Sequence, residues 1–150
     1  MSEIRKHITA EMKEAMRSKD KTRLNTIRLI LAAAKQKEVD ERVVVSDDDM
    51  LVILDKLAKQ RKEAIKMYAE AGRDDLKAQE ESEYNVLLTF LPKQLSNDEI
   101  AQHIEQAIAS TGASSIKDMG KIMAIIKPVF QGRADMSLVS KEIKAKLVAG

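Results

Sequence analysis

The chain has 150 residues, of which 33% are charged and 3% are aromatic, and it contains no Cys. Without Cys, a disulfide framework, a thiolate metal site and a Cys nucleophile are excluded, and a reducing compartment is expected. The net charge of +2 does not by itself point to nucleic acid. No stretch approaches the roughly 18 to 20 apolar residues that span a bilayer, and residues 1–10 lack the apolar core of a signal peptide. We therefore expect a cytoplasmic protein without a membrane partner.

The first 92 residues carry the apolar periodicity of four long helices. Ile4, Ile8 and Met12 recur at four-residue intervals, which places them on one face of a helix. Ser46 before three Asp residues is typical of a helix start, because the hydroxyl caps a backbone N–H and the acids face the positive end of the helix dipole. Pro92 must end the fourth helix, because it disfavours helical geometry in the residue before it. We expect an antiparallel helical domain over residues 1–92, with helices near 4–18, 20–39, 47–71 and 74–91 and a connector at 40–45.

Beyond a hinge at residues 92–95 the expected helices become shorter. Ser96 and Glu99 form a capping box for the first of them, and Gly112 closes it. A second begins near residue 115, and we expect Pro128 to disrupt or end it. A third begins between residues 135 and 137. The fold class is therefore all-α, with a small three-helix C-terminal domain over residues 93–150, whose expected apolar positions include Ile104, Ile116, Ile122, Ile126, Leu138, Val139, Ile143 and Leu147.

No side chains combine into a recognisable catalytic, cofactor-binding or metal site. His7 and His103 lie on separate expected helices, and neither has partners at metal-ligand spacing, so we interpret both as boundary positions on helix surfaces. The five glycines form no phosphate-binding loop motif. We predict no catalytic residue, no metal and no cofactor, and the sequence leaves enzymatic activity open.

Five basic residues near the C-terminus form the first candidate site, which we call the tail cluster. Gly120 and Gly132 allow a close backbone approach beside them, and a helix start lies just downstream. Helix N-termini and Lys side chains together hold phosphates, and without aromatic residues nearby any RNA contact would be to backbone and shape. The tail cluster consists of Lys121, Lys127, Arg133, Lys141 and Lys144.

A second candidate site is the central run, which consists of Lys59, Arg61 and Lys62 in the middle of the third expected helix. Its side chains could contact RNA together with the tail cluster. A solvated helix face is the alternative explanation for such a run.

An ordered series of motifs resembles the YqeY-like family over essentially the whole chain. The family is related to the tail domain of the B subunit of the glutamine-dependent aspartyl/glutamyl-tRNA amidotransferase, where a Gly-Lys/Gln-x-Met helix and a Gly-Lys/Arg-Ala-Asp turn recur. The resemblance implies a helical module that contacts tRNA while other domains, absent from this sequence, perform the chemistry. The matching stretches are Met12–Arg17, Arg23–Ala34, Lys59–Lys62, Ala71–Asp74, Tyr84–Leu95, Gly120–Met123 and Gly132–Asp135.

Three functions remain open at this stage. The first is a non-catalytic module that binds tRNA or other structured RNA through backbone contacts. The second, implied by the resemblance alone, is an accessory component of glutamine-dependent amide transfer that acts with an amidotransferase or synthetase subunit, that is, with a carbon–nitrogen ligase. The third is a protein-interaction scaffold that uses the apolar faces of the long helices.

Overall fold

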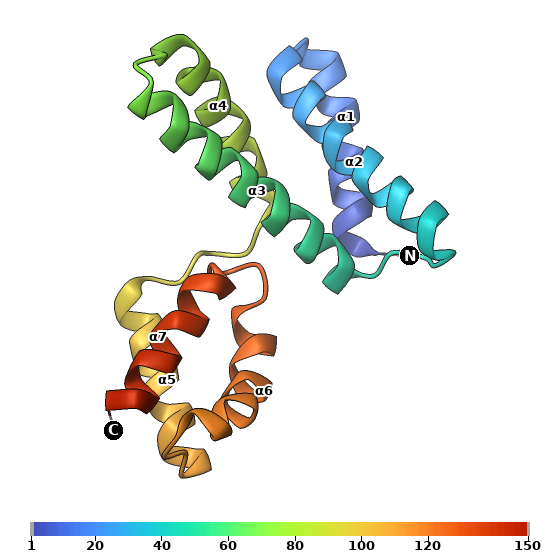
Figure 1. The fold of residues 1–150 in the computed structure, drawn as a ribbon. Coiled ribbons are helices and arrows are strands. Elements are labelled where there is room, and N and C mark those ends of the chain that lie inside the picture. The colour runs from blue at the N-terminus through green and yellow to red at the C-terminus, as the bar shows by residue number, and fades with distance from the viewer. Residues whose placement is uncertain (1, 150) are drawn as a thin grey trace. The chain divides into compact units, whose positions relative to one another are not determined.

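The computed structural model describes residues 2–149, which form seven α-helices, a short 3-10 helix and no strand (Figure 1). The all-helical prediction is confirmed. The chain divides into two compact units, unit 1 (Met1–Pro92) and unit 2 (Lys93–Gly150). The elements are α1 (Glu3–Ser18), α2 (Lys21–Glu41), α3 (Asp47–Glu70), α4 (Asp74–Phe90), α5 (Asn97–Thr111), η1 (Ile116–Asp118), α6 (Met119–Phe130) and α7 (Met136–Ala149).

Unit 1 consists of two antiparallel helical pairs, α1 with α2 and α3 with α4. Caps fix where the helices begin: the Asp20 carboxylate accepts the Arg23 N–H at 3.1 Å, and Ser46 forms a capping box with Asp49. Gly72, with φ of 70°, follows the end of α3 as expected. The core of unit 1 is a single cluster of buried side chains that includes Ile8, Ile27, Ile30, Met50, Leu54 and Leu87.

Unit 2 packs α5, α6 and α7 around Phe130, whose side chain is fully buried. The capping box of Ser96 with Glu99 and the left-handed Gly112 bound α5 as predicted. Each helix directs about one apolar side chain per turn to this centre. Three short helices are therefore enough to enclose a buried core. The buried cluster also contains Ile104, Ala107, Ile122, Ile126, Val139, Ile143 and Leu147.

Pro128 lies inside α6, and the prediction that it disrupts or ends this helix is wrong. Proline has no N–H, so one intrahelical bond is missing, but the loss falls in the last turn. The helix continues for two more residues, and the Gln131 N–H bonds to the Lys127 carbonyl at 3.0 Å. Continuing the turn buries Phe130 completely, and burial of a side chain of this size contributes about 2 to 3 kcal/mol.

Two side chains that we expected on apolar faces are exposed. Ile116 is 45% exposed because it lies in η1, before the regular face of α6 begins. Leu138 is 60% exposed because Val139 and Ile143, four residues apart, define the core side of α7. Leu138 is therefore turned about 100° away from the core side.

Candidate nucleic-acid interface

The start of α6 is organised by Asp118. Its Oδ2 accepts the Ser114 N–H at 3.0 Å, and its Oδ1 lies 3.7 Å from Lys121 Nζ. The hydrogen bond from Ser114 and the charge of Lys121 hold the pKa of Asp118 below its ordinary range. The Lys121 side chain nevertheless remains 69% exposed, so its ammonium group stands beside the first turn of α6 and is accessible to an anion.

Gly120, next to Lys121, has no structural reason to be glycine. A Cβ atom added there would meet no atom within 4 Å, and its φ is not in the left-handed region. Glycine in a helix costs about 0.5 to 1 kcal/mol relative to alanine. The fold therefore carries a small destabilisation here and leaves an open patch of backbone at the surface.

The turn between α6 and α7 is tied to the segment that precedes α5. The Gln94 amide donates to the Gly132 carbonyl at 2.7 Å, and the Leu95 N–H donates to the Arg133 carbonyl at 2.8 Å. Arg133 Nε in turn donates to the Lys93 carbonyl at 3.1 Å. Gly132 takes a φ of 72°, which favours glycine. Arg133 is thus held in place through one of its five N–H donors.

The structure spreads the tail cluster along unit 2. Lys121 lies near the start of α6 and Arg133 lies just past its end, so most of this helix, a rise of about 14 Å from Lys121 to Phe130, separates the two. Lys141 and Lys144 are exposed neighbours, one turn apart, on the solvent side of α7. Lys127 is exposed in the last turn of α6. The five side chains form an extended surface and no pocket.

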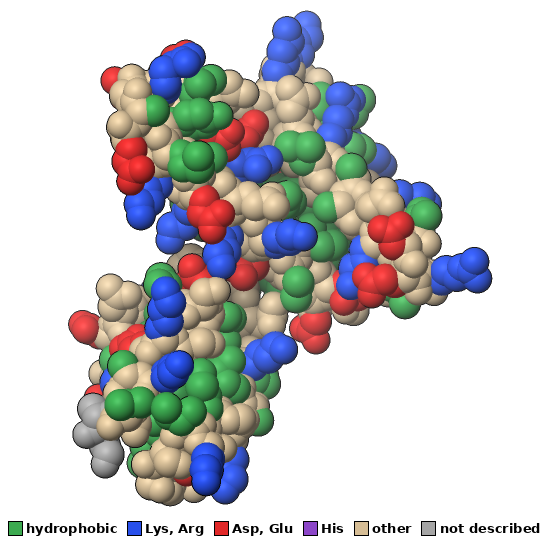
Figure 2. All heavy atoms as spheres, in the orientation of Figure 1, with side chains coloured by type: hydrophobic (Ala, Val, Ile, Leu, Met, Phe, Trp, Pro, Cys, Tyr) green, Lys and Arg blue, Asp and Glu red, His purple; other side chains and the backbone are tan. Residues whose placement is uncertain are grey.

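Exposed apolar side chains alternate with the tail cluster. Ile125 and Val129 lie one turn apart on α6 and are 45% and 38% exposed, and Val148 on α7 is 66% exposed. Figure 2 shows this mixture on the visible face of unit 2, where Lys and Arg side chains stand apart around an area of hydrophobic ones. The surface of unit 2 therefore combines positive charge with apolar contact area.

The central run does not act as one surface. Arg61 Nε lies 2.8 Å from a Glu83 oxygen and 3.5 Å from a Glu80 oxygen, and the three side chains are only 18% to 21% exposed. This guanidinium therefore joins α3 to α4. Lys59 and Lys62 are exposed on α3. Sequence spacing alone had grouped these residues, although only the two Lys side chains face solvent.

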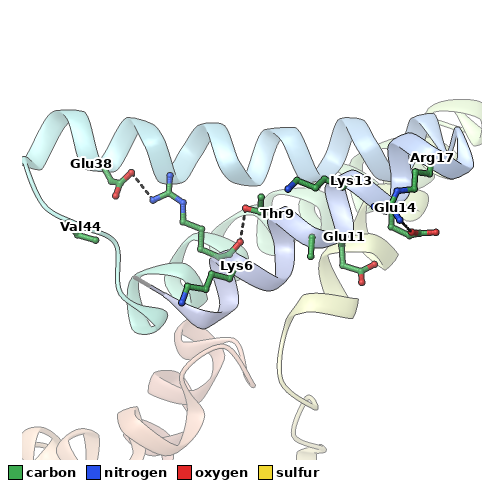
Figure 3. Close-up of a pocket in the computed structure, with 10 residues that line it drawn as sticks. Lys6, Thr9, Glu11, Lys13, Glu14, Arg17, Glu38 and Val44 are labelled. Carbon is green, nitrogen blue, oxygen red and sulfur yellow. Dashed lines mark hydrogen bonds and ion pairs between the residues drawn. The ribbon is translucent and has the colours of Figure 1, made fainter.

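A polar groove runs along the outer side of α1 (Figure 3). Arg5 lies 2.7 Å from Glu38 of α2 within it, and this guanidinium holds the pKa of Glu38 below its usual range. Arg17 and Glu14 form a second pair at 3.6 Å. These two pairs lie within the groove, whereas Lys6 and Glu11 pair with Glu3 and Arg23 outside its lining. The groove offers no acid–base pair aimed at a common point.

Among residues 2–149, no group of three or more His, Asp or Glu side chains is arranged to hold a metal ion. Both histidines meet an aromatic ring edge-on, His7 against Phe90 at 5.8 Å and His103 against Phe130 at 5.5 Å. No helix in this range is both long and apolar enough to cross a bilayer.

These features define an all-helical protein with an extended surface of basic and apolar side chains. The chain belongs to the YqeY-like protein family, whose model matches residues 5–147. It is 32% identical to a protein of Vanderwaltozyma polyspora named "Altered inheritance of mitochondria protein 41, mitochondrial" over 90% of this chain and 71% of that protein. It is 38% identical to the protein of that name from Eremothecium gossypii, over 57% of this chain and 47% of the relative. The second alignment thus covers less than half of that relative.

Proposed function

We propose that the protein is a non-catalytic helical module that binds tRNA or other structured RNA through the phosphate backbone. The observation that carries this proposal is the start of α6, where the exposed Lys121 adjoins Gly120, a glycine that packing does not require. An exposed ammonium group beside a surface glycine is suited to a phosphate oxygen, because the absent side chain of Gly120 lets the phosphate approach the backbone closely. The exposed Lys side chains of α7 extend the same charge along unit 2.

The aromatic content of unit 2 favours backbone contacts over base recognition. Phe130 is the single Phe, Tyr or Trp among residues 93–150, and it is fully buried. Sequence-specific recognition of RNA relies on bases stacked on aromatic or Arg side chains. A surface without exposed aromatic rings is better suited to phosphates and to the shape of a folded RNA.

The proposal is tested by measuring tRNA affinity of the full chain against salt concentration. Changing Lys121→Ala together with Arg133→Ala should weaken binding and lower the salt slope by about one per lost phosphate contact. Lys121→Ala alone serves as a second variant, because Arg133 also supports the turn before α7. A thermal melt of each variant checks folding, and unchanged affinity in both folded variants would remove these residues from the interface.

The second proposal is an accessory role in glutamine-dependent amide transfer with a partner carbon–nitrogen ligase. It is supported by the family resemblance, whose two glycine motifs lie at opposite ends of α6. Copurification should then recover an amidotransferase or synthetase subunit, and recovery of neither speaks against the role. Enzymatic activity of the isolated chain is no part of this proposal.

The exposed apolar side chains of unit 2 support a third proposal, a protein-interaction scaffold. Leu138 and Val148 on α7 are 60% and 66% exposed. Contact surfaces for proteins combine such side chains with a polar rim. Concentration-dependent self-association that Leu138→Ser abolishes would favour the scaffold over RNA binding.

A cytoplasmic location stays a prediction. The two fungal relatives carry the word mitochondrial in their names, which describes those proteins. Fractionation of cells that express the full chain tests the prediction, and recovery in an organelle fraction would contradict it.

A further inference from the structure

Charge is divided unevenly within unit 1. Residues 1–37 carry 10 basic and 4 acidic side chains, whereas residues 38–92 carry 8 basic and 14 acidic ones. The first group covers α1 and most of α2, and the second covers the end of α2, α3 and α4. The near-neutral composition of unit 1 therefore hides a basic helical pair beside an acidic one. Figure 2 shows Lys and Arg side chains projecting along the α1–α2 pair.

The basic residues of α2 include three that share one line on its solvent side. Lys21, Arg28 and Lys35 are exposed and stand seven residues apart, and we call them the α2 stripe. Seven residues make two helical turns less about 20°, so the three side chains point in nearly the same direction along about 21 Å. Asn25 and Ala32, which lie between them, are also exposed.

Carboxylates do not neutralise the α2 stripe. Residues 21–37 contain no Asp or Glu. Among residues 2–149, no carboxylate oxygen lies within 4.0 Å, the limit for an ion pair, of a charged nitrogen of the stripe. Glu38, one turn beyond Lys35, is held by Arg5 at 2.7 Å. The three charged groups thus face solvent without a close ion pair, and Lys35 acts on Glu38 only through the longer-range attraction of its charge.

Arg23, also on α2, shows the opposite behaviour. It lies off the line of the stripe, pairs with Glu11 at 3.1 Å and covers the ring of Phe90 at 5.3 Å. Its guanidinium therefore joins α1, α2 and α4. Arg23 therefore contributes to the packing of unit 1, whereas the three exposed cations of the stripe take no part in it.

We propose that the α2 stripe is a second RNA-binding surface, which takes the phosphate backbone of a structured RNA along its length. The proposal rests on the RNA-binding function proposed above and adds a site on unit 1. Phosphate and sugar are bound by Lys, Arg, Asn, Gln and Thr side chains, and the stripe is flanked by exposed Thr22, Asn25 and Gln36.

The same face offers little to an acidic protein partner. Stable protein interfaces have an apolar centre with aromatic anchors, and the exposed apolar side chains here, Leu29 and Val39, are ten residues apart. Ala32 in the middle is small. A row of cations without an apolar centre favours a polyanion whose charges repeat along a backbone, which describes RNA.

The test is a stripe variant that carries Lys21→Gln, Arg28→Gln and Lys35→Gln in the full chain. Gln removes the charges and keeps a side chain with good helix propensity, so the melting temperature should stay close to that of wild type. We expect tRNA affinity near 0.1 M salt to fall at least about tenfold, and the salt slope to fall by about two to three.

A matched control removes three exposed charges from the acidic half of unit 1, by Lys56→Gln, Lys66→Gln and Arg73→Gln. It lowers the net charge of the chain by the same amount, and we expect its affinity to change less than twofold. An equal loss in both variants would show that net charge alone matters and would overturn the α2 stripe as a site.

The two RNA proposals can fail separately. If Lys121→Ala weakens binding and the stripe variant does not, the α2 stripe is overturned and the tail cluster stands. If the stripe variant alone weakens binding, the α2 stripe stands and the tail cluster falls. Absence of tRNA binding by wild type overturns both. Competition by poly-L-glutamate as effective as that by RNA would show a site for acidic polypeptide and would also overturn the RNA assignment.

Discussion

The central run on α3 and the α2 stripe carry the same kinds of side chain, but the Arg of the central run is largely buried in ion pairs and the Arg of the α2 stripe is exposed. In the central run, Arg61 lies against Glu80 and Glu83 of α4 and is about four-fifths buried. In the α2 stripe, Arg28 is exposed, and the surrounding residues 21–37 contain no Asp or Glu. Within the central run only Arg61 faces the acidic side chains of α4, whereas Lys59 and Lys62 are exposed like the three cations of the α2 stripe. Helical spacing and the charge of the packed partner decide the outcome.

The largest expected effect tests whether Arg61 belongs to the fold. Arg61→Ala leaves the Glu80 and Glu83 carboxylates, both about four-fifths buried, without a counter-charge. We expect the free energy of unfolding to fall by about 2 to 3 kcal/mol in urea denaturation. The exposed Lys62 supplies the control, because Lys62→Ala should change it by less than about 0.5 kcal/mol. Equally small decreases for both variants would show that the ion pairs of Arg61 do not stabilise the fold.

Two glycines of unit 2 sharpen the distinction between fold and interface. A Cβ atom would meet nothing within 4 Å at Gly120 or at Gly112, but Gly112 has a φ of 66°. Gly112→Ala should therefore destabilise by about 1 kcal/mol, and Gly120→Ala should stabilise by about 0.5 to 1 kcal/mol.

Gly120→Ala should weaken tRNA binding while it raises the melting temperature. An increase in stability with unchanged affinity would take Gly120 out of the interface. Gly112→Ala, which lies in the same unit, controls for any effect of stability on binding.

Removing the acidic partners should convert the central run into a surface like the α2 stripe. Glu80→Gln with Glu83→Gln frees the charge of Arg61 and raises the net charge by two. We expect tRNA affinity at low salt to rise a few-fold, because long-range attraction follows local charge. The corresponding change at the end of α3 and the start of α4, Glu70→Gln with Asp74→Asn, lies away from Arg61 and should raise the affinity less. Equal gains would mean that neutralisation of Arg61 has no role.

The smallest expected effect concerns Glu38, next to the α2 stripe. Its hydrogen bond from Arg5 lowers the pKa in the folded state, so its contribution to stability is complete above the unfolded pKa of about 4.3 and is lost as the pH falls through the lower folded value. The free energy of unfolding should decline below about pH 4.5. Glu38→Gln should make that decline shallower, and an identical decline would contradict this role of the ion pair.

Local signals in the sequence were sufficient to predict the helices and most of their ends. Ser46, Ser96 and Gly112 act through neighbouring backbone groups, so their roles are visible in a few residues. Pro128 was misjudged because the burial of Phe130, a tertiary effect, outweighs a local rule.

The sites were harder to predict. The partners of Arg61 lie 19 and 22 residues further along the chain. Residue spacing within one helix does not predict which side chains of another helix it will contact. The pattern of the α2 stripe is present in the sequence as basic residues at intervals of seven without intervening acids, but these residues are not contiguous and do not form a basic run.

The most direct test of the RNA-binding account is titration of labelled total tRNA with the purified full chain at two salt concentrations. A structureless RNA of equal length is the control. The account predicts tight binding that prefers tRNA and weakens steeply as salt rises. No binding at low salt, or equal binding of both RNAs, would contradict it.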